Sequence, residues 1–242
     1  MRVRVVGDGV LAQTTRVCCA PYFGGDVQVG EADLVWACED TPIGAGDRPD
    51  VDWVVTRLRS EVVGLTPRTP VVLSSQVPVG TTARLEREWP HIDWAYSPEN
   101  IRVKTAVADF QRQARIIAGR RGTAHDDRLR TLFAPFTDTV LLTDPETAEM
   151  CKHALNAYLG LSIAFMNEIA RVAAVVGADA QMISQALLTE ARISPRAPLR
   201  PGPPFGEGHL ARDIYVLTAL AQEQGIAAPI ISHIRESNEG GR

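Results

Sequence analysis

Cysteine is scarce in this sequence, and its spacing argues against the common structural uses of a thiol. The four cysteines are Cys18, Cys19, Cys38 and Cys151. None forms the CxxC pair typical of zinc sites and redox-active disulfides, and no disulfide framework is indicated. We therefore predict no metal site and interpret the four side chains as small buried hydrophobic groups.

Long apolar runs and blocks of basic residues are missing as well. No uninterrupted apolar stretch approaches the roughly 20 residues of a membrane span. The first residues, MRVRVVGDG, lead directly into a strand pattern rather than a signal sequence. With a net charge of −4 and dispersed arginines, the chain is a poor partner for nucleic acid or an anionic membrane. We expect a cytoplasmic protein.

What the sequence does contain is typical of a globular protein. Of its 242 residues, 45% are hydrophobic and 22% are charged. This length suffices for one large domain or for two domains of ordinary size. We find no internal repeat and no low-complexity segment.

Short apolar runs alternate with helical patterns in the first part of the chain. The runs lie at 2–7, 32–38, 69–75, 92–97 and 114–119, with a weaker one at 138–143. Such alternation favours a parallel sheet joined by crossover helices. The fold class that we predict is α/β, with a Rossmann-like, mostly parallel sheet that binds a dinucleotide and occupies residues 1–143.

The second part, residues 144–242, is predicted to be all-helical. TDPETAEM supplies helix-start residues, and nothing interrupts the helix from 145 to Val176, where Gly177 ends it. Shorter helices are expected at about 179–190 and 209–224, and the tail RESNEGGR is expected to be frayed. Because the helix 145–176 is apolar on more than one face, we expect it to form a homodimer interface.

A glycine-rich turn follows the first strand. VVGDGVLA places Gly7, Gly9 and Ala12 in a G-x-G-x-x-A pattern, which allows backbone to approach a pyrophosphate at a helix N-terminus. The acidic residue that would hold the adenosine ribose is expected about 20 positions later. Asp26 stands near that distance, but the segment is too short for a full strand, helix and strand. Binding on the adenosine side is therefore in doubt.

Several segments together resemble one enzyme family. They are SSQVPVGTT (74–82), YSPENIR (96–102), EMCKHALNAYLGLSIAFMNEIA (149–170) and ARISPR…PGPPFGEGHLARD (191–213). In order and spacing they are similar to the UDP-glucose/GDP-mannose dehydrogenases. The resemblance implies a Rossmann-like NAD domain, a long dimerising helix and oxidation of a sugar-nucleotide alcohol. Most members oxidise the alcohol twice, through a cysteine thiohemiacetal.

The sequence departs from the family in several places. His209 stands where the family has its catalytic cysteine, and the family's third domain has no counterpart in these 242 residues. The second-strand region of the cofactor domain is shortened. Gln76 and Val103 replace a threonine and a second glutamate that are common in the family.

The resemblance assigns several residues to the site. Lys152 and Asn156, four apart and so on one helix face, belong to its catalytic centre, and Glu99 follows a strand end where it assists catalysis or orients Lys152. Asn167 continues the same helix face, either in the site or bridging a packing defect. The cofactor residues expected beside the glycine turn are Thr41, Pro42, Ser74 and Ser75, for which ordinary turn chemistry is the alternative.

The residues of the Gly/Pro loop and the helix after it complete the expected site. His209 and Asp213 are four apart, so that the carboxylate could fix the imidazole tautomer for a proton shuttle. Arg192 matches a family arginine that reaches the partner subunit's substrate. Arginines at 192, 196, 200 and 212 make the region basic, which suits an anionic substrate or is simply solvated charge. The substrate-binding candidates are Arg102, Arg192, Phe205, Gly206 and Arg212.

Imidazole does not replace cysteine in the four-electron reaction, because it is not expected to hold an aldehyde through a second oxidation. We therefore predict an NAD- or NADP-dependent oxidoreductase that performs a single two-electron step on an anionic, sugar-like or nucleotide-linked alcohol. Two alternatives stay open: a non-redox acid–base enzyme that uses Lys152, Glu99 and His209, and a catalytically silent binding partner on the same fold.

Overall fold

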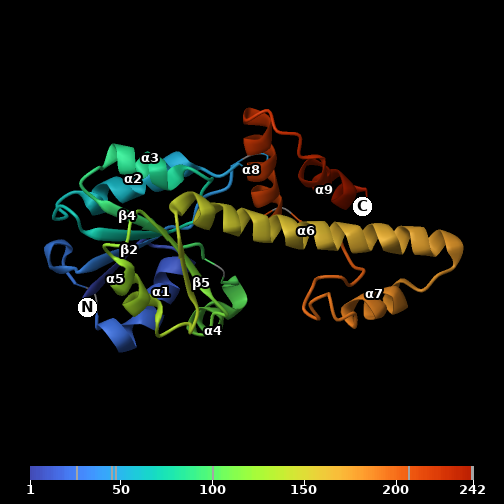
Figure 1. Cartoon of the computed structure of the whole chain (residues 1–242), viewed down its shortest axis with the longest axis horizontal. Coiled ribbons are helices and arrows are strands. Elements are labelled where there is room, and N and C mark those ends of the chain that lie inside the picture. Colours follow the sequence, from blue (N-terminus) through green and yellow to red (C-terminus); the bar gives the residue numbers. More distant parts are fainter. Residues whose placement is uncertain (26, 45, 47, 100, 207, 241–242) are drawn as a thin grey trace. The chain divides into compact units, whose positions relative to one another are not determined.

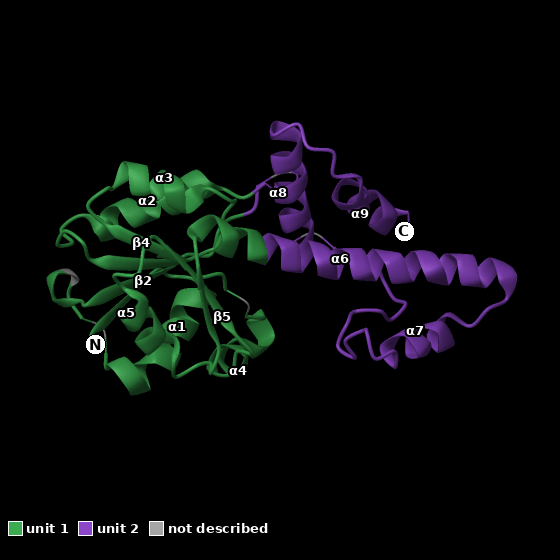
Figure 2. Ribbon diagram, in the orientation of Figure 1, with its two compact units in different colours: residues 1–42, 49–151 green, residues 43–48, 152–242 purple. Residues whose placement is uncertain are grey.

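The structure, a computed structural model, describes residues 1–25, 27–44, 46, 48–99, 101–206 and 208–240. The chain divides into two compact units (Figure 2): Met1–Pro42 with Pro49–Cys151, and Ile43–Arg48 with Lys152–Arg242. The division falls inside one helix, after Cys151. The boundary expected at residues 143 and 144 stays a prediction.

A six-stranded sheet forms the centre of the first unit. In spatial order its strands are β1 (Val3–Val6), β2 (Leu34–Cys38), β3 (Pro70–Ser74), β4 (Asp93–Tyr96), β5 (Ile116–Arg120) and β6 (Val140–Thr143). Every neighbouring pair is parallel except β4 and β5. The six predicted strands are thus confirmed, as is the mostly parallel, Rossmann-like sheet. β5 runs antiparallel to β4, because the segment between them begins and ends at the same end of the sheet.

Helices cover both faces of the sheet (Figure 1). On one face lie α1 (Val10–Phe23), α4 (Ala106–Gln111) and α5 (Asp126–Phe133), and on the other α2 (Val51–Val62) and α3 (Thr81–Glu88). Along β2, Trp36 packs into the first layer while Val35 and Ala37 pack into the second. Strands buried on both faces in this way appear in the sequence as continuous apolar runs.

The crossover through α1 is unusual. β1 to β2 and β2 to β3 step in the same direction across the sheet, yet α1 and α2 lie on opposite faces, so the two crossovers have opposite hands. Since about 98% of parallel crossovers are right-handed, one of them is an exception. In the usual Rossmann order the strand after α1 lies on the far side of β1. Here residues 24–33 lead directly from α1 to β2, with only the 3-10 turn η1 (Val29–Glu31) among their described part.

β1 is therefore an edge strand, and an arginine covers its open side. The Arg2 carbonyl accepts a hydrogen bond from Leu34 on β2, so by alternation the carbonyls of Val5 and Gly7 point away from β2. The Arg16 guanidinium donates to both, at 3.2 and 2.6 Å. A charged side chain at this position satisfies the edge and discourages pairing with another strand.

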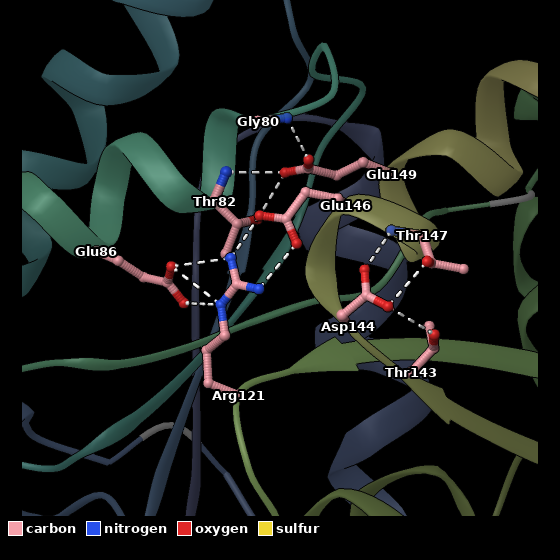
Figure 3. Close-up of polar contacts among 9 residues, drawn as sticks. All are labelled: Gly80, Thr82, Glu86, Arg121, Thr143, Asp144, Glu146, Thr147 and Glu149. Atoms are coloured by element: carbon pink, nitrogen blue, oxygen red, sulfur yellow. Dashed lines mark hydrogen bonds and ion pairs between the residues drawn. The ribbon is translucent and has the colours of Figure 1, made fainter.

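The first turns of α6 (Pro145–Val176) are fixed to the first unit (Figure 3). Asp144 caps the helix by accepting from the Thr147 backbone N–H at 2.8 Å and its hydroxyl at 2.9 Å. Arg121 forms ion pairs with Glu146 and with Glu86 of α3. These contacts hold the first turns of α6, up to Cys151, within the first unit.

The second unit is all-helical, as expected. The helix predicted for 145–176 has those bounds, and Gly177 ends it at a positive φ of 72°. It is followed by α7 (Ala180–Leu188), α8 (His209–Glu223) and α9 (Pro229–Glu239).

The expectation of a frayed tail is wrong for the described residues up to 240. Helix α9 includes Arg235–Glu239, because Pro229 starts it. Ile231 and Ile234 pack into the core of the unit. Asn238 also holds the backbone of Phe205 through two hydrogen bonds of 2.8 and 2.9 Å.

Among the described residues, one helix is long and apolar enough to cross a membrane by length and composition alone. An 18-residue window of α6 has a mean hydropathy of 1.6, and 33% of it is buried within the chain. A single helix of this kind is weak evidence for a span, because core helices of soluble proteins pass the same test. The apolar residues exposed on α6, among them Tyr158, Phe165 and Val172, therefore need a partner surface.

Candidate functional site

The turn between β1 and α1 has the geometry that the glycine pattern predicts. Gly7 has a φ of 114°, and a Cβ there would lie 2.0 Å from the carbonyl oxygen of Cys38. Gly9 is the N-cap of α1 and makes no side-chain cap of its own. Ala12 is fully buried. The backbone N–H groups of a helix start are thus presented at the carboxyl end of β1, the arrangement in which Rossmann domains hold a pyrophosphate.

Acidic side chains surround this turn. The Val10 N–H donates to Asp40 Oδ2 at 2.8 Å, and a Cβ on Gly9 would lie 1.9 Å from the same oxygen. Arg57 of α2 pairs with Asp8 and lies 3.9 Å from Glu39. Burial raises the pKa of the Glu39 carboxyl, an effect that Arg57 opposes. The ribose-binding candidate Asp26 lies outside the described residues.

The strand-end hydroxyls predicted as cofactor contacts are buried, and each makes hydrogen bonds within the first unit. Thr41 Oγ1 lies 2.6 Å from Ser75 Oγ, and Ser75 also donates to the Glu39 carbonyl. Ser74 donates to the Ser97 carbonyl and accepts from Trp36 Nε1. The Pro42 carbonyl accepts from the Asp50 N–H. These bonds join the ends of β2, β3 and β4, and a further role toward a cofactor stays a prediction.

Glu99 lies in the first unit, just beyond β4. Its carboxylate accepts hydrogen bonds from the Gln76 amide and from the Ile101 N–H at 3.0 Å. Arg102, a predicted substrate contact, instead makes a two-pronged ion pair with Asp109 while remaining exposed. That pairing lowers the pKa of the Asp109 carboxyl.

Two cavities of the first unit lie at opposite ends of the sheet. The one beside Ser74 and Glu99 measures about 20 Å³, little more than the space of one water molecule. The other, about 240 Å³, is lined at the opposite ends of β3 and β4 by residues that include Arg68, Asp93 and His125. Asp93 pairs there with both Arg68 and His125, so its charges are already compensated.

In the second unit, α6 carries the two polar residues that were expected to share a face. Lys152 is 6% exposed and Asn156 is 7% exposed. The chain contains 23 arginines and only two lysines, Lys104 and Lys152. Arginine thus supplies nearly all the positive charge of the chain. The buried position 152 nevertheless carries a lysine, whose charged group is a compact amine. Burying a lysine amine costs free energy. Residues buried at such a cost are common at functional sites.

Asp213 of α8 is fully buried and is bonded to α6. Its Oδ1 lies 2.9 Å from His153 Nδ1, and its Oδ2 accepts a hydrogen bond from the Asn156 amide. The expected pairing of Asp213 with His209 is therefore wrong: the imidazole that Asp213 contacts belongs to His153. Asp213 is fully buried, whereas His209, the first residue of α8, is exposed.

His209 has a different neighbour. Its Nδ1 lies 3.0 Å from a guanidinium nitrogen of Arg212. Because arginine can only donate, Nδ1 must accept, and the ring proton then resides on Nε2. The Nδ1 atom of His209 is thus bonded to Arg212, and the proton shuttle suggested by the sequence stays a prediction.

The other predicted loop residues have mostly structural contacts. Phe205 packs near Gly160 of α6, and Gly206 faces open space. Asn167 accepts from the Gly202 N–H at 3.0 Å, which favours its bridging role. Arg192 pairs with Glu190 and is exposed. Substrate contacts by Arg192, Phe205, Gly206 and Arg212 stay predictions.

Sequence reasoning missed three acidic or basic residues. His153 follows Lys152 and is three residues before Asn156, so helical spacing could have indicated it. Glu149 is an acid inside an apolar helix, three residues before Lys152. Asp40 follows a strand end next to Thr41. Within the described parts of the chain, no three His, Cys, Asp or Glu side chains form a metal site.

Two family models match most of the chain. Residues 22–137 match the NAD-binding domain of the UDP-glucose/GDP-mannose dehydrogenase family, and residues 146–240 match its central domain. NAD is accordingly the cofactor that these matches support.

Curated relatives and solved structures agree with those matches. A UDP-glucose 6-dehydrogenase of Pseudomonas aeruginosa is 30% identical over 87% of this chain and 49% of its own length. One from Rhizobium meliloti is 31% identical over 81% of this chain and 47% of its own length. The chain thus spans about half the length of the curated relatives it matches.

A UDP-glucose dehydrogenase structure from Pyrobaculum islandicum superposes with a TM-score of 0.79 at 25% identity, covering 88% of this chain and 51% of that one. A UDP-D-ManNAc dehydrogenase from Pyrococcus horikoshii superposes with a TM-score of 0.83 at 21% identity, covering 100% and 69%. The second likeness, at that identity, supports the fold alone.

Proposed function

Because the chain belongs to the UDP-glucose/GDP-mannose dehydrogenase family, we propose that it is an NAD-dependent oxidoreductase that oxidises an alcohol of a nucleotide sugar in one two-electron step. The observation that carries this proposal is the buried polar group on α6. Lys152 is followed there by His153 and Asn156, which both hold the fully buried Asp213. A packed helix with no chemical task has no need for so many desolvated polar groups.

Lys152, Asn156 and Asp213 of this group, together with His209, have tasks in the proposed reaction. The Lys152 amine binds the substrate oxygen and takes up its proton as the alcohol becomes a carbonyl. Asp213 fixes the orientation of Asn156 by accepting from its amide. The His209 imidazole helps to stabilise the oxygen on which negative charge develops. NAD, when bound, would supply the acceptor for the hydride of the carbinol carbon.

The backbone at the start of α1 supplies the place for the cofactor's pyrophosphate. Gly7 and Gly9 leave room for close approach, and the N–H groups of the first helical turn point to that place. The fit has one exception: Asp40 already bonds to the Val10 N–H.

The single oxidation step follows from the cysteine content. No cysteine occurs after Cys151, so the loop that ends at His209 contains no thiol for a thiohemiacetal. Without that covalent adduct the carbonyl product is released after one hydride transfer. One alcohol and one NAD then give one carbonyl, one reduced cofactor and one proton.

A second copy of the chain is the partner that we propose for α6. Tyr158, Phe165 and Val172 are exposed by 58%, 45% and 63%. They repeat every seven residues and so form one stripe along the helix. Two such stripes packed in a symmetric dimer would remove the apolar surface from water. Light scattering should give a dimer for the parent chain and a monomer for Phe165→Glu, whereas Val63→Glu in the first unit should remain dimeric.

Turnover of nucleotide sugars tests the enzymatic proposal. Purified chain is mixed with NAD and UDP-glucose or GDP-mannose, and the absorbance of the reduced nicotinamide is followed. Lys152→Met should lower the rate about 10²–10⁴-fold. Lys104→Met, which removes the exposed lysine of the chain, is the matched control and should keep the parent rate.

The outcome also separates the alternatives. A non-redox acid–base enzyme would form no reduced cofactor with any sugar. It would still convert its substrate, and Lys152→Met would lower the rate of that conversion. A silent binding partner would be insensitive to both lysine substitutions. Either result would contradict the proposed oxidation.

A further inference from the structure

The N-terminus of α1 holds an anion that belongs to the chain itself. The Val10 N–H is one of the helix-start donors with no partner inside the helix, and it donates to Asp40 Oδ2 at 2.8 Å. The same oxygen lies against Gly9, where a Cβ would be only 1.9 Å from it. Asp40 thus fills the space that the glycine turn leaves open for a pyrophosphate.

The charges around this position oppose a second anion. Asp8, Glu39 and Asp40 bring three carboxylates to the turn, and Arg57 is the guanidinium that contacts two of them. A pyrophosphate would add about two negative charges to this cluster. It can bind well only when the Asp40 carboxylate has left.

The fold makes this position unusually important for a dinucleotide. β1 is an edge strand, its open side is covered by Arg16, and the usual strand beyond it is not formed in the described residues. The adenosine half of a cofactor therefore meets little sheet there. More of the cofactor's binding free energy must come from the pyrophosphate, for which Asp40 competes.

Asp40 is also able to leave. It is exposed, and the bond to Val10 is the one hydrogen bond found for its side chain within the described part of the chain. An exposed cap of this kind contributes modestly to helix stability. We propose that Asp40 is an internal competitor of the cofactor's pyrophosphate and sets the affinity of this site for dinucleotides.

The proposal rests on the proposed function, because NAD is its ligand, but it can be tested separately with inorganic pyrophosphate. Asp40→Asn retains the size of the side chain and an oxygen that can cap Val10, and it removes only the charge. Asp40→Gly removes the side chain altogether. Asp52→Asn is the matched control: Asp52 is an exposed residue of α2 whose partner is Arg84, and the substitution makes the same change in net charge.

Calorimetric titration of the full chain and the three variants with NAD, and separately with pyrophosphate, measures the competition. Asp40→Asn should bind both ligands about tenfold more tightly than the parent, the effect expected of one charge at a helix N-terminus in a partly buried setting. Asp40→Gly should bind at least as tightly as Asp40→Asn. Asp52→Asn should match the parent.

The two ligands distinguish the possible failures. Tighter pyrophosphate binding by both Asp40 variants, without NAD binding by any protein, would support the competitor and contradict the proposed function. NAD binding that is equal in all four proteins would support the proposed function and overturn the competitor. No binding of either ligand to the Asp40 variants would overturn the competitor as well.

Discussion

Two helices of the first unit begin against a carboxylate from a distant part of the chain. Glu149 of α6 caps α3, accepting from the Gly80 N–H at 2.6 Å and from the Thr82 N–H and hydroxyl at 2.8 and 2.7 Å (Figure 3). Asp40 caps α1 with a single bond to Val10. Glu149 is fully buried, whereas Asp40 is exposed.

The difference separates a structural anion from a replaceable one. Glu149 satisfies three donors where water cannot reach, so losing it leaves buried polar groups without partners. Asp40 satisfies one donor beside solvent, and a water or a phosphate oxygen can take its place. The same helix-start chemistry thus fixes α3 to α6 in one case and regulates access to a ligand position in the other.

The largest effect on stability is expected at Asp213, a carboxylate of the second unit that is fully buried, as Glu149 is in the first. Asp213→Ala should lower the free energy of unfolding by about 3 kcal/mol, because it leaves the His153 imidazole and the Asn156 amide buried without their partner. Urea unfolding measures it. Glu236→Ala, at an exposed carboxylate of α9, is the control and should stay within about 0.5 kcal/mol of the parent. Equal losses for the two variants would place Asp213 among the replaceable carboxylates.

Glu149→Gln tests the structural anion directly. The amide NH₂ of glutamine would face a backbone N–H that now donates to an oxygen, so we expect a loss of about 1–3 kcal/mol. Glu86→Gln, in the last turn of α3 and partly exposed, controls for the loss of one charge. A Glu149→Gln variant as stable as Glu86→Gln would remove the distinction between the two caps.

The stability difference between the parent and Glu149→Gln should depend on pH. Burial raises the pKa of the Glu149 carboxyl above its ordinary value, so the folded state takes up this proton more readily than the unfolded state. The contribution of Glu149 is then fullest below the unfolded-state pKa of about 4.3 and declines as pH rises through the folded-state pKa. The advantage of the parent should therefore grow as pH is lowered from neutral. If the stability advantage of the parent over Glu149→Gln shrinks on acidification, the pKa of the Glu149 carboxyl is not raised by burial.

The smallest effect is expected at Asp40. Asp40→Asn should change the free energy of unfolding by no more than about 0.5 kcal/mol, because asparagine caps a helix about as well as aspartate does. Thermal unfolding without ligand measures the change. A loss as large as that of Glu149→Gln would show that Asp40 is structural and make a replaceable cap untenable.

Local patterns predicted most of the fold. The six strands and α6 could be predicted because apolar runs, helix-start residues and Gly177 act over a few residues. The conformation of the glycine turn was predictable for the same reason. The tail from Arg235 was misjudged because its own residues are polar. The isoleucines that pack α9 into the core, Ile231 and Ile234, precede it.

The partners of the site residues could not be predicted, because they depend on distant parts of the chain. Asp213 meets His153 from 60 residues away, and this choice over His209 depends on how α8 is rotated against α6. Asp40 reaches Val10 from 30 residues away. The glycine pattern therefore predicted the conformation of the turn and gave no indication that Asp40 bonds to it, while its role toward a cofactor stays a prediction.

The yield of reduced cofactor per molecule of nucleotide sugar consumed tests the central claim most directly. The account predicts one reduced nicotinamide for each sugar, with a carbonyl product, because His209 stands in the loop in place of a thiol that would retain the intermediate. Two reduced nicotinamides and a carboxylate product would contradict the single oxidation, and none would contradict the oxidoreductase itself.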